Sequence, residues 1–106
     1  MAGTTLKAAT SQIATLFGVS EDELSRQALI SLLREKKREV LQLRLDLLTR
    51  YGAESVDDLE TKIAEGAVLE HPAWEDLIAA ENLGSRLEEL NAYLDRLQGA
   101  TADLAA

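Results

Sequence analysis

The sequence predicts an all-α protein: a long helical hairpin with a short connecting helix, assembled with further copies as a helical-bundle oligomer. Leucine dominates the apolar content, with 20 leucines against four valines and four isoleucines, and only four residues are aromatic. Leucine favours helices, whereas strands are rich in β-branched and aromatic residues. No Gly or Pro interrupts residues 19–51, which therefore have room for one long helix.

The first element is a helix over about residues 5–17. Small and apolar residues recur there at helical spacing, at Leu6, Ala9, Ile13 and Leu16, before Gly18 supplies a C-terminal stop. A short strand over residues 4–7 is the alternative at this end of the chain.

The second helix has the strongest start signal. Ser20 and Glu23 have the spacing of a capping box, and Val19 and Leu24 fit the hydrophobic staple around it. A helix from Glu21 to Tyr51 would be roughly 46 Å long. Its second half carries two neighbouring apolar stripes, Val40, Leu43, Leu47 and Leu41, Leu45, Leu48. A helix with two apolar stripes must pack against two neighbouring elements.

A short helix and a long one follow. Ser55 can cap a helix that bears Val56, Leu59 and Ile63 and ends at Gly66. Pro72 suits the first turn of the last helix, because its missing N–H has no intrahelical partner there. This helix is expected to end at Gln98, before Gly99. Its leucines repeat with steps of four and three, as in a coiled coil, at Leu83, Leu87, Leu90, Leu94 and Leu97.

A single hairpin cannot cover both stripes of its long helix, so the sequence predicts burial against another copy. The expected oligomer interface consists of Leu41, Leu45, Leu48, Leu83, Leu87, Leu90, Leu94 and Leu97. Within one structural domain, residues 1–52 would form an oligomerisation region and residues 53–106 an acidic partner-binding region.

The charge is divided unevenly between these regions. Residues 1–52 hold eight Lys or Arg and six Asp or Glu, a net of +2, whereas residues 53–106 hold three and 13, a net of −10. Such asymmetry indicates two surfaces with different partners, or else simply uneven solvated helix faces. No basic start precedes an apolar block and no run of about 18 apolar residues occurs, so a cytoplasmic protein is expected.

No enzyme signature is present in the sequence. It has no cysteine, one histidine and no Gly-rich phosphate loop, so neither catalytic residues, a metal nor a cofactor is expected. His71 beside Glu70 and Glu75 could hold a metal weakly, but a lone histidine among surface carboxylates is more often solvated. We therefore expect His71 to have no catalytic or metal-binding role.

A basic interval in the second helix allows nucleic acid binding, though weakly. The candidate contacts are Lys7, Arg26, Arg34, Lys37 and Arg38. Because Glu35 and Glu39 are interleaved with them, a solvated, internally paired face is the favoured interpretation.

Trp74 is the strongest candidate anchor for a partner, since tryptophan is enriched among residues that dominate binding energy. Leu77 and Ile78 follow it at helical steps of three and four and would add apolar contact. The nearby acidic residues would steer a basic partner toward this face, namely Glu70, Glu75, Asp76 and Glu81.

Two segments resemble known families. IATLFGVSEDELSRQALISLLREKK resembles the helix-turn-helix stretch of ribbon-helix-helix proteins, through Gly18, Val19, Ser20, Leu24, Ala28 and Leu29. RYGAESVDDLETKIAEGAVLEHPAWEDLIAAENL is similar to the acidic tails of small prokaryotic antitoxins of toxin–antitoxin operons, which often carry a Tyr-Gly-x-x-Ser turn and a Trp-Glu-Asp stretch. The resemblance implies an antitoxin that neutralises a small basic toxin.

The sequence thus predicts a non-enzymatic, homo-oligomeric interaction protein. More specifically, it predicts an antitoxin. The alternative is a structural protein that only self-associates through its leucine seam. A DNA-binding regulator using residues 4–7 and 26–38 is a weaker alternative.

Overall fold

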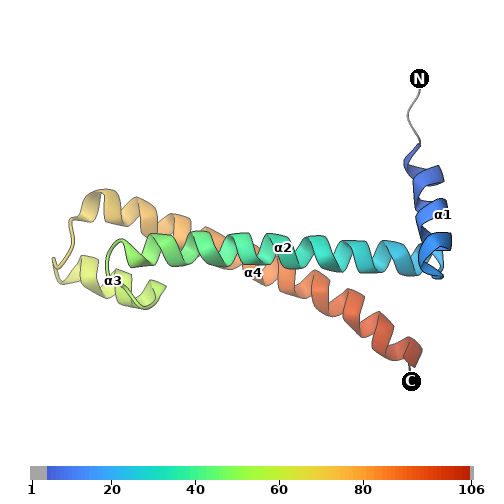
Figure 1. The fold of residues 1–106 in the computed structure, drawn as a ribbon. Coiled ribbons are helices and arrows are strands. Elements are labelled where there is room, and N and C mark those ends of the chain that lie inside the picture. Colours follow the sequence, from blue (N-terminus) through green and yellow to red (C-terminus); the bar gives the residue numbers. More distant parts are fainter. Residues whose placement is uncertain (1–4, 106) are drawn as a thin grey trace.

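The computed structural model describes the backbone of residues 5–105 and the side chains of residues 5–99. Its four helices are α1 (Leu6–Phe17), α2 (Glu21–Thr49), α3 (Val56–Ala64) and α4 (Glu70–Ala105), and no strand is present among the described residues. The long helices α2 and α4 run antiparallel, α3 lies beside them at one end, and α1 projects from the other end (Figure 1). The predicted all-α hairpin with a short connecting helix is confirmed.

Two of the three helix caps, Ser20 and Ser55, were predicted from the sequence, whereas the cap at Thr5 was not. The Thr5, Ser20 and Ser55 hydroxyls each accept a hydrogen bond from the backbone N–H three residues later, at 3.0 to 3.1 Å. Such bonds satisfy N–H groups that have no partner inside the helix. Because Thr5 is the cap and Leu6 is already helical, a strand over residues 5–7 is wrong, and Thr4 lies outside the described residues.

The two ends of α4 differ in how well they were predicted. His71 has extended backbone angles (φ −109°, ψ 121°), so regular helix begins at Pro72, as expected. The predicted stop at Gly99 is wrong, because the helical backbone continues to Ala105. A glycine inside a helix costs only about 1 kcal/mol relative to alanine. Gly18, by contrast, ends α1 in the left-handed conformation with φ 70°.

The core lies at the three-helix end of the molecule, where the last turns of α2, the whole of α3 and the first turns of α4 meet. Its buried residues are Leu48, Leu59, Ile63, Ala73, Leu77 and Ala80. Half-buried side chains surround them, including Leu47, Tyr51, Val56 and Val68. Here three helices enclose the apolar side chains on several sides.

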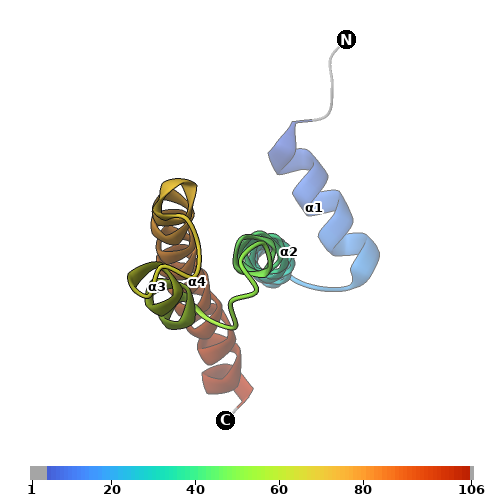
Figure 2. The ribbon, with the colours of Figure 1, turned by 90° about the vertical axis from the view of Figure 1, so that its left-hand side faces the viewer.

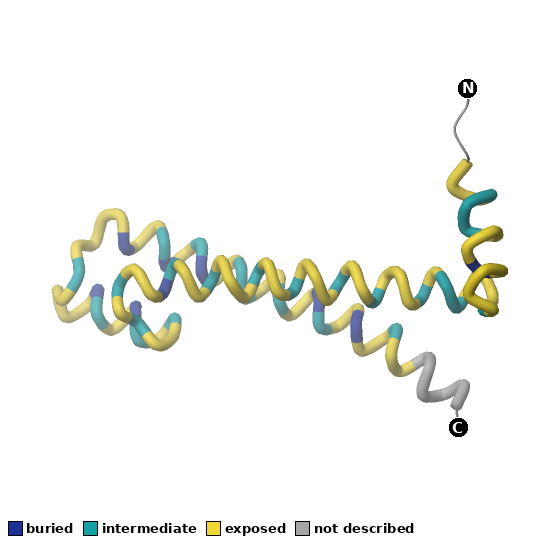
Figure 3. The backbone as a smooth tube through the Cα atoms, in the orientation of Figure 1, coloured by how far each residue is buried: buried dark blue, intermediate teal, exposed yellow. Residues whose placement is uncertain are grey.

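Beyond this core, the chain continues as a two-helix arm made by α2 and α4. The side of α2 that packs on α4 shows half-buried residues at alternating steps of four and three, at Arg26, Ile30, Leu33, Lys37, Val40, Arg44 and Leu47. Three of these are basic, so the contact is less apolar than the leucine pattern of α4 indicates. Most of the arm's surface remains exposed (Figure 3).

The leucine seam is therefore used inside one chain. Leu48, Leu90 and Leu94 are only 6%, 8% and 6% exposed, so the prediction that they form an oligomer interface is wrong. Leu83, Leu87 and Leu97 are half-buried. Leu41 and Leu45 stay exposed, and their role in an oligomer remains a prediction.

The molecule is elongated. Its radius of gyration is 20.2 Å, and its extents are 60 × 44 × 15 Å. A compact chain of this length would have a radius of about 13 Å. Figure 2, viewed along the hairpin, shows α1 standing apart from α3 and α4. No helix in the described part of the chain is long and apolar enough to cross a membrane.

Candidate functional site

The candidate site is a cavity at the three-helix end, between α3 and the first turns of α4. Its volume is about 550 Å³. One wall comes from the exposed edge of α3, and the other from the residues on either side of Pro72. The lining residues are Glu60, Ile63, Ala64, Glu70, His71, Trp74 and Glu75. The cavity thus combines apolar walls with three carboxylates.

Trp74 lines this cavity, and 52% of its surface is exposed. Its position follows from the rotation of α4, because Ala73 and Leu77 on either side are buried in the core. Ile78 is 46% exposed, whereas Leu77 is 1% exposed. The prediction that Leu77 contacts a partner is wrong, since a residue enclosed by α2, α3 and α4 cannot reach one. Trp74 and Ile78 are placed where a partner could contact them.

The predicted acidic residues divide into two groups. Glu70, Glu75 and Glu81 are exposed, and Glu75 Oε1 lies 3.3 Å from His71 Nδ1. Asp76 is instead half-buried and serves the fold. Its carboxylate accepts a hydrogen bond from the Tyr51 hydroxyl and lies 3.7 Å from Arg50 Nη1. Asp76 therefore ties the start of α4 to the end of α2 rather than facing a partner.

The contact with Asp76 also affects the titration of Tyr51. The carboxylate that accepts its hydrogen bond raises the pKa of Tyr51 above the ordinary value of 10.0, and burial acts in the same direction. The nearby Arg50 guanidinium opposes this by lowering the pKa. A neutral phenol is favoured here because deprotonation would bring two negative charges together. This pair was not predicted from the sequence, since 25 residues separate its members.

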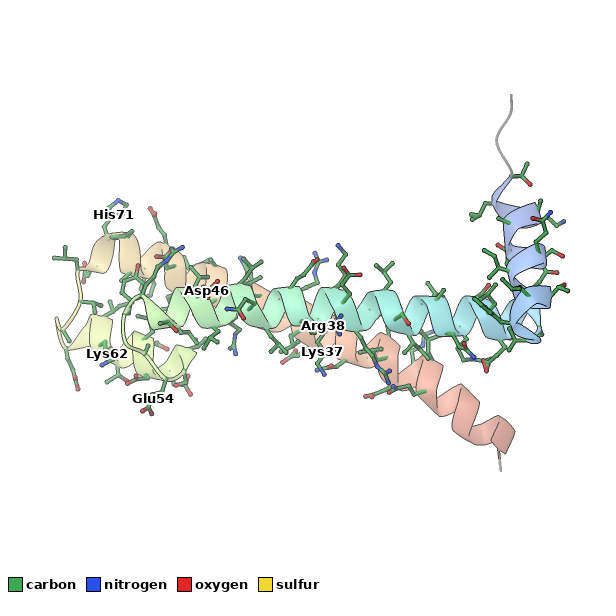
Figure 4. All side chains as sticks on the ribbon, viewed as in Figure 1. Lys37, Arg38, Asp46, Glu54, Lys62 and His71 are labelled. Carbon is green, nitrogen blue, oxygen red and sulfur yellow. The ribbon has the colours of Figure 1, made fainter. Side chains whose placement is uncertain are left out.

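The basic residues considered for nucleic acid differ in exposure and in pairing. Arg26 pairs with Asp22 and Glu23 of its own helix, at 3.2 and 3.0 Å. Lys37 is half-buried in the seam with α4, whereas Arg38 is exposed (Figure 4). The other two members, Lys7 and Arg34, are exposed on α1 and α2.

A third basic residue in the seam was also missed by the sequence analysis. Arg44 reaches from α2 to α4, and its Nε donates a hydrogen bond to the Ala80 carbonyl at 3.2 Å. Its Nη2 lies 3.4 Å from the point that a Cβ at Gly84 would occupy. This is ordinary van der Waals contact, so the Arg44 side chain packs over Gly84.

Two further apolar grooves run along the arm, between α2 and α4. One of about 500 Å³ is lined by Leu29, Leu32, Leu33, Tyr93, Arg96 and Leu97. The other, of about 690 Å³, lies nearer the core and includes Val40, Leu43, Leu83 and Leu90. The leucines of α2 on this side belong to the apolar stripes of its sequence, and Leu29, Leu32 and Leu43 remain 50%, 50% and 55% exposed.

The described side chains contain no group of three or more His, Cys, Asp or Glu residues arranged to hold a metal ion. No curated protein and no solved structure matches the chain. The model of the family described as the uncharacterized protein MJ0235 family matches residues 1–102. Since the match spans nearly the whole sequence, the chain belongs to the MJ0235 family.

Proposed function

We propose that this chain is a non-enzymatic interaction protein that self-associates through its two-helix arm and binds a basic protein partner at its three-helix end. The specific form that we propose is an antitoxin that neutralises a small basic toxin. The antitoxin assignment rests on the resemblance of residues 50–83 to acidic antitoxin tails, and the site supplies the physical support for a basic partner.

The exposed Trp74 beside an acidic cavity is the observation that carries the proposal. Tryptophan has a large apolar surface, and half of it here faces solvent together with Ile78. Burying such side chains against a partner is favourable by about 25 cal/mol per Å² of apolar area removed from water. The surrounding carboxylates favour a partner of opposite charge and would accelerate its approach.

Self-association is supported by the apolar surface that one chain leaves uncovered. Leu29, Leu32 and Tyr93 are about half exposed along the arm. On α1, Leu6, Leu16 and Phe17 are more exposed still. Contiguous apolar surface of this kind marks an interaction site in soluble proteins. A second copy packed along the arm would give both helices a second neighbour.

Co-expression tests the antitoxin proposal. The chain is produced together with each protein encoded by a gene next to its own, in a host whose growth is monitored. We expect one of these proteins alone to arrest growth, and its co-expression with the chain to restore growth and give a purifiable complex. The absence of arrest by any of them, or an arrest that the chain does not relieve, would contradict the proposal.

A protein that only self-associates is the second candidate, and the exposed apolar side chains of α1 and the arm favour it as well. The two candidates differ at Trp74. In the second, the assembled oligomer would cover Trp74 by itself, and its fluorescence would shift to shorter wavelength with increasing protein concentration. In the first, this shift would require the basic partner.

A further inference from the structure

We infer that the cavity between α3 and α4 holds an arginine side chain of a basic protein partner. The inference rests on the proposed function and deepens it, because it names the chemical group that this site takes.

The cavity has the size and the walls that a long amphipathic side chain requires. Its volume of about 550 Å³ lies within the about 300–1,000 Å³ of typical ligand pockets. Ile63 and Ala64 form an apolar wall on α3, and Trp74 lines the same space from α4. The aliphatic stem of arginine packs on such walls while its charged head stays near solvent.

The charge in the cavity is negative. Glu60, Glu70 and Glu75 come from two different helices and contribute three carboxylates. The start of α4 adds only about half a positive charge, and a protonated His71 would add one more. Lys62, the basic residue of α3, does not line the cavity and lies on the opposite side of this end from His71 (Figure 4).

Two of these carboxylates are available to a ligand. Glu75 is 3.3 Å from the His71 ring, but Glu60 and Glu70 form no ion pair within the described part of the chain. A cation that enters the cavity is attracted by each of these carboxylates. The cavity is thus electrostatically complementary to a cation.

Arginine fits this arrangement better than lysine. A guanidinium is planar, stacks on an indole ring and presents donors in a fork that matches carboxylates on more than one side. An ammonium is a compact, strongly hydrated charge that would have to shed water to reach the ring. Trp74 on one wall and carboxylates on both helices favour the planar group.

An NMR titration of the full chain tests the inference. The probes are the peptide acetyl-Ala-Ala-Arg-Ala-Ala-amide and two peptides with citrulline or lysine in place of the arginine. Citrulline keeps the shape and loses the charge. We expect saturable shifts of the Trp74 indole N–H and the Ile63 and Ala64 amides. The arginine peptide should bind about tenfold tighter than the citrulline peptide, as expected for one cation–π contact and two exposed ion pairs.

Charge-matched variants locate the site. The double variant Glu60→Gln/Glu70→Gln should weaken binding of the arginine peptide by about threefold or more. Its control, Glu88→Gln/Glu89→Gln, loses the same charge from exposed positions further along α4 and should leave binding unchanged. Equal binding of arginine and citrulline, equal binding of arginine and lysine, or equal weakening in both double variants would each overturn the inference.

The outcome is separable from that of the proposed function. If the chain relieves growth arrest but the arginine peptide does not bind, the inference fails and the proposed function stands. If the peptide binds and no toxin is neutralised, the proposed antitoxin function fails while the arginine site stands.

Discussion

Truncation of Leu77 should destabilise the fold, whereas truncation of its neighbour Ile78 should not. Leu77 is 1% exposed in the core between α2, α3 and α4, and Ile78 is 46% exposed. Leu77→Ala removes the equivalent of roughly three methylene groups, at about 0.8 kcal/mol each. The cavity left behind adds to this loss, so we expect a decrease of about 3 kcal/mol in the free energy of unfolding. Ile78→Ala leaves an open surface and should cost about 1 kcal/mol or less.

Urea unfolding followed by circular dichroism measures both variants against the parent chain. Each curve should be repeated at a tenfold lower protein concentration, so that loss of fold is distinguished from loss of association. An unchanged slope with urea would show that the unfolded state is comparable. Equal losses for the two variants, or a loss below about 0.5 kcal/mol for Leu77→Ala, would show that α4 is rotated differently on the core.

Three further predictions follow from local contacts. Tyr51→Phe should lower stability at neutral pH by about 1 kcal/mol, through loss of a hydrogen bond to a carboxylate. Because its pKa is raised on folding, the stability contributed by Tyr51 is fully present below the unfolded pKa of about 10 and is lost as pH rises through the folded pKa. The parent and Tyr51→Phe should therefore converge in stability as the pH becomes alkaline, and a constant gap between them would contradict this. Ser20→Ala removes the cap of α2 and should cost about 1 kcal/mol, and an unchanged melting temperature would show that the 3.0 Å bond contributes nothing. Leu29→Asp/Leu32→Asp should shift sedimentation from oligomer to monomer without loss of helix, and a monomeric parent chain would refute self-association.

The helices were predictable because their signals are local. The caps Ser20 and Ser55 and the stop at Gly18 act within one turn, so four consecutive residues suffice to place them. Gly99 shows that a local signal does not always decide where a helix ends. The same residue type ends one helix and is tolerated inside another, because the free energy difference is small.

The site was predictable only in part, since it depends on how α4 is rotated and on what it packs against. Periodicity showed that the leucines of α4 share a face, but it could not show that α2 of the same chain covers them. Periodicity also grouped Leu77 with Trp74 and Ile78. In the structure Leu77 is buried, whereas Trp74 and Ile78 are exposed. Asp76 and Tyr51 meet only because the hairpin closes.

Calorimetric titration of the purified chain with the toxin that it neutralises in the co-expression test shows most directly whether Trp74 is a binding residue. Trp74→Ala should raise the Kd by about thirtyfold, equivalent to roughly 2 kcal/mol for an interface hot spot, and should leave helical content and melting temperature nearly unchanged. His71→Ala, the matched variant on the same cavity, should bind almost like the parent. An unchanged Kd for Trp74→Ala, or a loss of about 3 to 5 kcal/mol in folding stability instead, would contradict the proposal and place Trp74 in the core.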